Sequence, residues 1–379
     1  MKIPVFKPYL GSLEIEAAVR SLELGWLGPG SFVKEFETGL ASLLEVNPEN
    51  VVAVNTGTSA VHLGLKLCGV GAGDEVITPS FNNIADFQMI KSLHANPVFC
   101  DVTEDSLTMD VRQLPGLISN KTKAIICLDY GSSLCDYEAI EKIAKQHSIP
   151  VLYDAAHSFG SSTDRGKVGS YSDISAFSFD PVKNITCIDG GAVIVKSKEQ
   201  AEKIRYMRLL GQKQNQDKLY ANNRSWTYDV DELGYRYHLA NLHAAIGVEQ
   251  LKKFEEIARK RRELFKFYHQ ELKDVEGLKL PLPVQPGIVP FIFVIRVLNN
   301  RRSDFTNFLH SNGVDTGIHW QPGHRFTLLK NCKAADLSIT NKIADEIVTL
   351  PFYPDLSMDE AKHITDIIKQ FYVGIKEHD

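Results

Sequence analysis

The sequence predicts an α/β protein with a large, mostly parallel sheet domain and a smaller C-terminal α/β domain. Three observations support this: apolar runs alternate with amphipathic helical patterns over residues 48–195, a long helical pattern follows at 239–272, and a second alternation begins after 287. Continuous apolar strands between helices are typical of parallel sheets covered on both faces. A chain of 379 residues is also long for one core, so we expect a large domain at 1–250, with its N-terminal segment packing on a small domain at 251–379.

The first alternation supplies the elements of the large sheet in order. Expected strands are NVVAVN (50–55), DEVITPS (74–80), NPVFCDV (96–102), TKAIICLDY (122–130), IPVLYDAA (149–156), DISAFSF (173–179) and GGAVIVK (190–196). Expected helices between them are 58–70, 83–95 and 136–148. The strands at 173–179 and 190–196 lie too close together for a helical crossover, so they are expected to pair antiparallel.

The helix at 239–272 has no internal breaker and is long enough to join the two domains. The polar segment 207–226 before it is expected to be a loop. After the proline-containing stretch 280–287 we expect a strand at 288–297. Helix and strand then alternate through 302–314, 316–320, 342–352 and 357–373, as in a second, smaller α/β unit.

Composition and charge exclude several classes of protein. A net charge of -5 provides no basic surface for nucleic acid, and no apolar run approaches the eighteen or so residues of a membrane span. The N-terminus has no signal-peptide pattern, and the six cysteines form no CxxC pair, so neither a zinc site nor a disulfide framework is indicated. We therefore expect a cytoplasmic protein with reduced cysteines and no metal.

The first chemical pattern is NTGTSAVHLGL (55–65), where a strand ends and a helix begins. Gly57 would let the backbone approach a ligand, and the N–H groups of Thr58 and Ser59 would face it, as in an anion site at a helix N-terminus. An ordinary N-cap is the alternative interpretation.

The second pattern is VLYDAAHSFG (151–160), where Asp154 ends a strand and His157 follows. This carboxylate could hold a protonated ring nitrogen, or it could simply cap the next segment.

The third pattern surrounds Lys183, which interrupts two apolar strands and is expected to be desolvated by Phe177, Phe179, Val182 and Ile185. Burial would lower its pKa, and a neutral amine is what Schiff-base formation requires. Ser178 could donate its hydroxyl to a phosphate, whereas a surface lysine with an extended stem is the alternative. Together, a phosphate cradle, a carboxylate and an isolated lysine fit pyridoxal 5'-phosphate.

The sequence resembles the DegT/DnrJ/EryC1/StrS family of pyridoxal-phosphate-dependent nucleotide-sugar aminotransferases. The resemblance runs nearly end to end through the segments 3–37, NTGTSAVHLGL, DEVITPSF, YGSSLCDYEAI, DAAHSFG, SFDPVKNITCIDGGAVI, ELGYRYHLANLHAAIGVEQL, HWQPGH and LPFYPDLSMDE. It implies the aspartate-aminotransferase-like fold (fold type I) and a homodimer with active sites at the subunit interface.

The resemblance also implies roles for individual residues. Lys183 would bind the cofactor aldehyde and then move the proton, Asp154 would pair with the ring nitrogen, and His157 would lie near the phenolic oxygen. The phosphate would be held by Gly57, Thr58, Ser59 and Ser178, and Arg236 would reach it from the neighbouring subunit in place of an asparagine.

Several positions depart from the family pattern. Asn83 replaces an aromatic ring that stacks on the cofactor, for which Phe81 or Phe87 could compensate, and His238 replaces an arginine. Asp86, where a threonine is common, and His324, in a loop shared with His319, are expected on the substrate side. Lys213, Lys218 or Arg224 could meet the nucleotide diphosphate.

The predicted reaction transfers an amino group from L-glutamate to a 4-keto-6-deoxyhexose on UDP, dTDP or GDP, for cell-envelope polysaccharide or glycoconjugate synthesis. The C4 position is favoured because KNITC followed by an acid and Gly-Gly is most similar to the C4-aminating branch. A 3-keto substrate is the alternative within the family, and a regulatory protein with a degenerate cofactor site is the alternative of another class. Lys183 argues against the dehydratase relatives, which carry histidine there.

Overall fold

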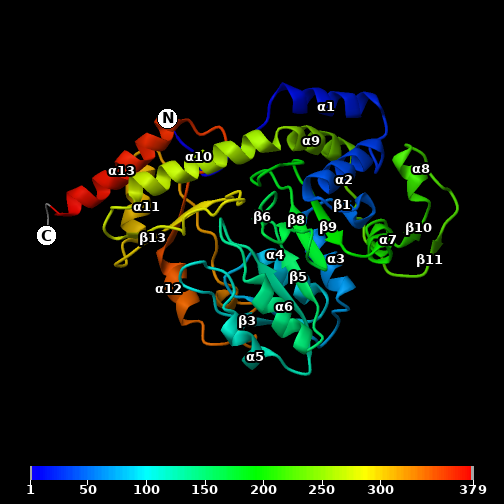
Figure 1. Cartoon of the computed structure of the whole chain (residues 1–379), viewed down its shortest axis with the longest axis horizontal. Helices are drawn as coiled ribbons and strands as arrows, with labels where there is room; N and C mark the ends of the chain where they lie inside the picture. Colours follow the sequence, from blue (N-terminus) through cyan, green and yellow to red (C-terminus); the bar gives the residue numbers. More distant parts are fainter. Residues whose placement is uncertain (1, 377–379) are drawn as a thin grey trace.

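Seven strands form the central sheet in the computed structural model, which describes residues 2–376 (Figure 1). They are β1 (Val51–Val54), β2 (Glu75–Pro79), β3 (Asn96–Cys100), β4 (Thr122–Leu128), β5 (Val151–Asp154), β8 (Ile174–Ser178) and β9 (Gly191–Val195), in the order β1-β9-β8-β5-β4-β2-β3. Only β9 runs against its neighbours, with Phe177 opposite Ala192. The mostly parallel sheet and the antiparallel β8–β9 pair are therefore confirmed.

Helices cover both faces of this sheet. They are α2 (Ser31–Leu44), α3 (Gly57–Leu67), α4 (Ile84–Ser92), α5 (Leu114–Leu117), α6 (Tyr137–Gln146), α7 (Lys198–Met207) and α9 (Asn241–Lys252), whereas α1 (Ser12–Glu23) packs against α9. Alternate strand residues face opposite sides: Ala53 and Phe177 pack toward α2 and α9, whereas Val54 and Ala176 pack toward α3 and α7. Burial on both faces explains why the strands read as continuous apolar runs.

Short elements decorate the large sheet. They are β6 (Ser162–Thr163), β7 (Gly166–Lys167), β10 (Gln212–Lys213), β11 (Asp229–Val230), α8 (Gln216–Tyr220) and the 3-10 turns η1 (Pro48–Asn50) and η2 (Val111–Gln113). The segment 207–226, expected to be a loop, therefore contains β10 and α8. Asn215 explains the latter, because its side chain accepts the N–H groups of Asp217 and Lys218 and caps the helix.

The C-terminal part forms a second sheet of three antiparallel strands, β12 (Leu278–Lys279), β13 (Phe293–Val297) and β14 (Ile347–Leu350). It packs with α10 (Phe254–Leu272), α11 (Arg302–Ser311), α12 (Ser338–Glu346) and α13 (Met358–Lys376). The 3-10 turn η3 (Gly323–Arg325) lies in the loop between α11 and α12. The strand expected at 316–320 is wrong: only Gly317 forms a bridge, to Thr349. Ile3, near the N-terminus, packs in the apolar core of this second sheet, and its N–H donates to the Gly313 carbonyl.

The helix expected at 239–272 is two helices, α9 and α10, separated at Lys253. The Lys253 ammonium contacts the Glu14 carboxylate at 2.7 Å, so the break coincides with the docking of α1. Helix α10 then runs from the large sheet to the small one (Figure 1). The domain boundary predicted at residue 250 falls inside α9, and residues 377–379 of the predicted small domain lie outside the described part.

Within residues 2–376, none of the helices combines the length and apolar character that crossing a bilayer requires.

Candidate active site

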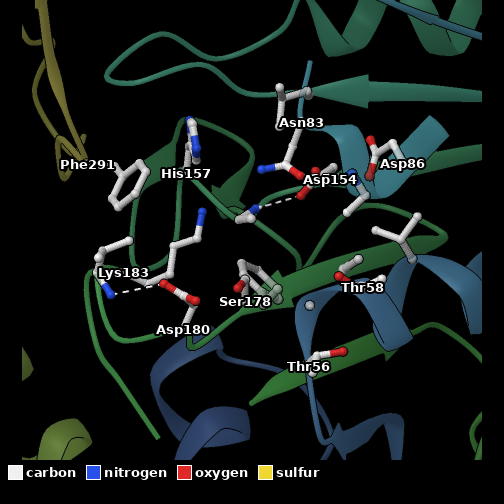
Figure 2. Close-up of a pocket in the computed structure, with 18 of the residues that line it drawn as sticks. Thr56, Thr58, Asn83, Asp86, Asp154, His157, Ser178, Asp180, Lys183 and Phe291 are labelled. Atoms are coloured by element: carbon white, nitrogen blue, oxygen red, sulfur yellow. Dashed lines mark hydrogen bonds between the residues drawn. The ribbon is translucent and has the colours of Figure 1, made fainter. Parts of the chain in front are cut away.

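A cavity of about 350 Å³ opens at the carboxyl ends of β1, β5 and β8, beside the N-termini of α3 and α4 (Figure 2). Parallel α/β sheets place their ligands at this edge. We call it the lysine cavity; its lining includes Thr56, Gly57, Thr58, Asn83, Asp86, Asp154, His157, Ser178, Asp180, Val182, Lys183, Asp189, Phe291, His319 and Trp320. The predicted lysine, carboxylate and helix N-terminus thus lie in one site.

A tight turn places Lys183 in the cavity. The Lys183 N–H donates to the Asp180 carbonyl at 3.1 Å, and the Asp180 side chain accepts the N–H of Val182 at 3.1 Å. Aspartate followed by Pro181 suits the first two positions of such a turn, because the side chain caps the turn and proline fixes its φ. The local sequence therefore determines where the chain reverses.

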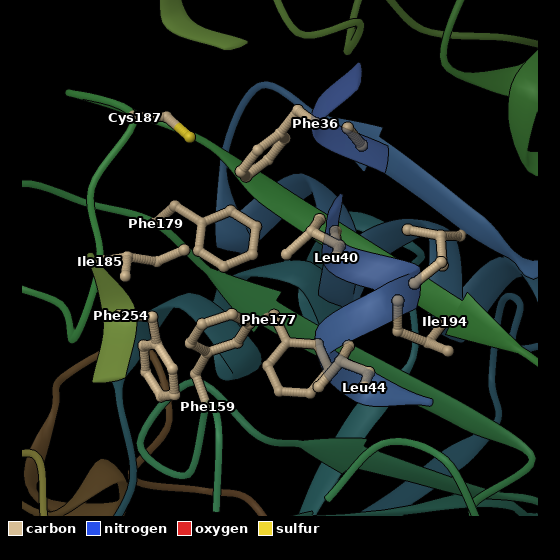
Figure 3. Packing of buried hydrophobic residues seen from close by; sticks show 14 of the residues in the cluster. Phe36, Leu40, Leu44, Phe159, Phe177, Phe179, Ile185, Cys187, Ile194 and Phe254 are labelled. Atoms are coloured by element: carbon tan, nitrogen blue, oxygen red, sulfur yellow. The ribbon is translucent and has the colours of Figure 1, made fainter. Parts of the chain in front are cut away.

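The apolar residues around the turn form its support (Figure 3). Phe177, Phe179 and Ile185 pack below it in one buried cluster with Phe159 and Phe254. Strand alternation directs Ser178, between the two phenylalanines, to the opposite side and into the lysine cavity. Phe177, Phe179 and Ile185, three of the four residues expected to desolvate Lys183, thus belong to the buried core that supports the turn.

The Lys183 ammonium lies 4.4 Å from the centre of the Phe291 ring. Burial is the main cause that lowers its pKa to about 8, although Asp154, Asp180 and Asp86 act in the opposite direction. The lowered pKa expected from the sequence is therefore confirmed. A substantial fraction of this amine is neutral near physiological pH, which nucleophilic attack on an aldehyde requires.

The N-terminus of α3 forms the anion end of the lysine cavity. Thr56 caps the helix by accepting the N–H of Ser59, so the first-turn N–H groups of Gly57 and Thr58 face outward without helical acceptors. A Cβ built at Gly57 would lie 2.6 Å from Ser178 Cβ, and one at Gly191 would lie 2.4 Å from the Thr56 carbonyl. Glycine at both positions lets the helix start approach β8 and β9, as a phosphate cradle needs.

Asp154 ends β5 and is 6% exposed. Its Oδ1 accepts the N–H of Ala156 at 3.0 Å, and within residues 2–376 no hydrogen bond is made to Oδ2. Burial raises the pKa of Asp154, whereas the Lys183 ammonium lowers it. A protonated ring nitrogen bound at Oδ2 would supply the hydrogen-bond donor that the protein does not.

His157 provides the clearest test of whether pyridoxal phosphate fits. Its Nδ1 accepts the N–H of Gly131 at 3.2 Å, so the neutral ring carries its proton on Nε2. Burial holds the pKa of His157 well below its usual range, and among residues 2–376 its buried Nε2 finds no hydrogen-bond partner. An unpaired N–H on a residue that lines this cavity fits an acceptor oxygen such as the cofactor's phenolate.

The structure places two of the predicted cofactor residues differently. Ser59 lies outside the lysine cavity, because its N–H donates to Thr56 and its hydroxyl to the Asn55 side chain at 2.6 Å. Asn83 does line the cavity, but its side-chain oxygen caps α4 through the N–H of Ala85. Phe81 and Phe87, offered as substitutes for the stacking ring, are fully buried elsewhere.

The two predicted substrate residues differ in position. Asp86 lines the lysine cavity and is only 1% exposed, beside Asp154 (Figure 2). His324 is not brought to the cavity: its Nδ1 lies 2.7 Å from Ser80 Oγ and its Nε2 lies 3.1 Å from Asn341 Oδ1. Its neighbour in the loop, His319, lines the cavity instead.

Arg236 lies in a separate cavity of about 450 Å³, which we call the arginine cavity. Its lining includes Trp26, Gly28, Pro29, Arg224, Trp226, Tyr228, Arg236 and His238. Arg236 therefore does not meet the lysine cavity of its own chain, and the contact predicted for it is one across a subunit interface.

Phe291 and Trp320 were missed by sequence reasoning, although both line the lysine cavity. The His157 ring lies 4.3 Å from Phe291 and 4.9 Å from Trp320, between centres. Both residues come from the C-terminal part of the chain: Phe291 lies in an apolar segment without a local chemical signal, and Trp320 lies in HWQPGH, where the histidines carry the signal. Only the packing of the small sheet against the large one, through Phe81, Tyr130 and Ile292, brings them here.

Comparison with known proteins gives a consistent result. A model of the DegT/DnrJ/EryC1/StrS aminotransferase family matches residues 8–369. The spore coat polysaccharide biosynthesis protein SpsC of Bacillus subtilis (strain 168) is 31% identical over 381 residues, which cover 98% of this chain and 97% of SpsC.

Solved structures agree in fold. The aminotransferase TlmJ from Streptoalloteichus hindustanus superposes with a TM-score of 0.92 at 30% identity, over 99% of this chain and 100% of that one. The sugar aminotransferase CalS13 from Micromonospora echinospora has a TM-score of 0.88 at 25% identity, over 97% of this chain and 99% of CalS13. The large mixed sheet is that of fold type I, and because the family model spans nearly the whole chain, the protein belongs to the DegT/DnrJ/EryC1/StrS aminotransferase family of pyridoxal-phosphate-dependent enzymes.

Proposed function

We propose that this aminotransferase transfers the amino group of L-glutamate to a 4-keto-6-deoxyhexose carried on UDP, dTDP or GDP. The observation that carries the proposal is the lysine cavity, where Lys183, with its pKa lowered to about 8, lies with Asp154 and His157 beside the N-terminus of α3. Membership of the family supports a sugar substrate. The KNITC pattern that follows Pro181 and Val182 supports the C4 position over the C3 alternative.

Bound pyridoxal phosphate would supply the electron-withdrawing ring that stabilises negative charge at the carbon losing its proton. The chain's own residues would do the rest. Gly57, Thr58 and Ser178 would hold the phosphate, Asp154 would keep the ring nitrogen protonated, and His157 Nε2 would donate to the phenolic oxygen. Lys183 Nζ would accept the proton and return it, because its neutral form is accessible near pH 7.

The name of SpsC, a spore coat polysaccharide biosynthesis protein, supports a product destined for a cell-envelope polysaccharide or glycoconjugate. A cytoplasmic location accords with this proposal, because nucleotide sugars are soluble intermediates.

The visible absorption spectrum with added pyridoxal phosphate tests the first half of the reaction. We expect a band that L-glutamate, but not D-glutamate, converts to that of the amino form of the cofactor. The cofactor's amino form is then offered 4-keto and 3-keto sugar nucleotides, and mass spectrometry identifies the aminated product. A band that does not respond to glutamate would favour the regulatory alternative, and amination of the 3-keto substrate alone would overturn the C4 assignment.

We also propose a homodimer whose subunits complete each other's sites. Ile15, Val19 and Leu22 form an exposed apolar stripe on α1 at helical spacing, and they are 67%, 46% and 54% exposed. Trp226, in the wall of the arginine cavity, is 85% exposed. A second copy covering these surfaces would bring Arg236 toward the partner's lysine cavity, and sedimentation velocity measures whether the protein is a dimer.

A further inference from the structure

The lysine cavity contains a second buried carboxylate that the proposed function does not use. Asp86 lies in the first turn of α4 and is 1% exposed, and Asp154 at the same end of the cavity is 6% exposed (Figure 2). One carboxylate is enough to pair with the single ring nitrogen of the cofactor, so the second carboxylate needs another explanation.

The hydrogen bonds around Asp86 fix its orientation without neutralising it. Asn82 Nδ2 donates to Asp86 Oδ2 at 2.7 Å and to Thr78 Oγ1 at 3.1 Å. Asn82 and Thr78 are fully buried, so this network is rigid. Within residues 2–376, no ammonium or guanidinium group is hydrogen-bonded to Asp86, and Oδ1 has no hydrogen-bond partner.

The charges facing Asp86 also favour its protonated form. Asp154 faces it from β5 and Lys183 from the β8–β9 loop; the other titratable groups of the cavity lining are His157, Asp180, Asp189 and His319. Burial raises the pKa of Asp86, the Asp154 carboxylate raises it further, and Lys183 and Asn82 oppose this only partly. Two interacting carboxylates that line one buried site behave as a pair that retains a proton.

We propose that Asp86 and Asp154 form an acid pair sharing one proton, and that Asp86 carries this proton when Asp154 faces the cofactor's ring nitrogen. Asp86 is then the neutral member of the pair and leaves a single negative charge beside the ring nitrogen, and on ionisation its proton passes to water. Asp86 is in this sense a positioning residue that acts through Asp154. The pair itself is independent of the substrate, and only its role toward the ring nitrogen rests on the proposed function.

Infrared difference spectroscopy on the cofactor-free protein tests the pair directly. At neutral pH the wild type is expected to show the C=O band of a protonated carboxylic acid, which Asp86→Asn removes and the matched variant Asp180→Asn retains. A wild type without this band, or a band that persists in Asp86→Asn, overturns the proposal. This measurement involves no sugar and no glutamate, so a failure of the amination proposal leaves it unaffected.

A second measurement follows cofactor binding. An amide at position 86 is neutral at every pH and can still accept the hydrogen bond from Asn82, so Asp86→Asn fixes the charge state that the proposal assigns to wild-type Asp86 at neutral pH. The wild type should lose affinity as Asp86 ionises at alkaline pH, whereas Asp86→Asn should not. Asp86→Ala should bind about tenfold more weakly at all pH values. Identical pH profiles for wild type and Asp86→Asn would overturn the proposal. If Asp86→Asn does not fold, the infrared test uses Asn82→Ala, and an infrared band that does not shift in this variant overturns the proposal.

Discussion

The lysine cavity and the arginine cavity contrast in how their cations are held. Lys183 is surrounded by buried groups of its own chain, and burial lowers its pKa to about 8. Arg224 and Arg236 lie on exposed walls with the exposed indole of Trp226. A half-buried cation that its own chain desolvates acquires its reactivity when the chain folds, whereas an exposed one keeps its hydration shell until a ligand or a second copy displaces it. The lysine cavity therefore desolvates its amine within one chain, whereas the arginines of the arginine cavity remain exposed.

Replacing Lys183 is expected to have the largest effect on this contrast. Lys183→Ala should lower transamination at least about 10³-fold, because Lys183 is the one lysine among the described residues that line the lysine cavity, and its amine is needed to bind the aldehyde and carry the proton. Single-turnover absorbance with L-glutamate measures it. Lys183→Arg keeps a cation but cannot bond covalently to the cofactor, so it should be equally inactive; turnover at the wild-type rate by either variant contradicts the assignment.

Asp154→Asn should come next, with a loss of about 10²-fold in kcat. An amide cannot hold the ring nitrogen in its protonated form, so the developing negative charge is less stabilised. The control is Asp180→Asn, another carboxylate of the lysine cavity, whose Oδ1 caps the lysine turn by accepting the Val182 N–H. Equal losses in the two variants would mean that net charge matters and the position of Asp154 does not.

The chemistry of the lysine cavity was predictable because each part has a local sequence signal. Gly57 after a strand marks a close approach, Asp154 ends an apolar strand, and a lysine between apolar strands stands out by its surroundings. These signals survive folding because they depend on neighbours within a few residues.

What the sequence could not predict depends on contacts between distant segments. His324 resembles a substrate ligand, yet Ser80 and Asn341 occupy both of its ring nitrogens. Phe291 reads as part of a strand and covers Lys183 only because the two sheets pack together. The α9–α10 break carries no glycine or proline, so no local pattern could reveal it.

Arg236→Ala should lower kcat/KM about tenfold, the cost of losing a charge-assisted contact with phosphate. Mixing it with Lys183→Ala sharpens the comparison of the two cavities. Hybrid dimers formed by random exchange of subunits hold one intact site, so activity should return to about a quarter of the wild-type value. Failure of the mixture to regain activity, with exchange confirmed by mass spectrometry, would place Arg236 outside the partner's site.

The pH dependence of cofactor attachment should be about tenfold per unit below pH 8. The reactive form of Lys183 is the neutral amine, so the rate of covalent attachment should rise with pH and level off above the pKa of about 8. Stopped-flow absorbance measures this rate. Asp154→Asn removes a carboxylate that raises the pKa of Lys183, so its midpoint should move to lower pH. A rate that keeps rising toward pH 10 would indicate an ordinary, solvated lysine.

The smallest effect is expected for His324→Ala. Its imidazole joins η3 to Ser80 and Asn341, so its loss should lower the free energy of unfolding by about 1–2 kcal/mol while kcat/KM changes less than about threefold. His319→Ala is the matched variant from the same loop: it lines the lysine cavity and bonds to Thr349 at 2.9 Å, so kcat/KM should fall further. Denaturant unfolding and steady-state kinetics separate the two effects. If His324→Ala lowers kcat/KM more than His319→Ala, the loop must rearrange around the substrate, and the contact predicted from the sequence for His324 would stand after all.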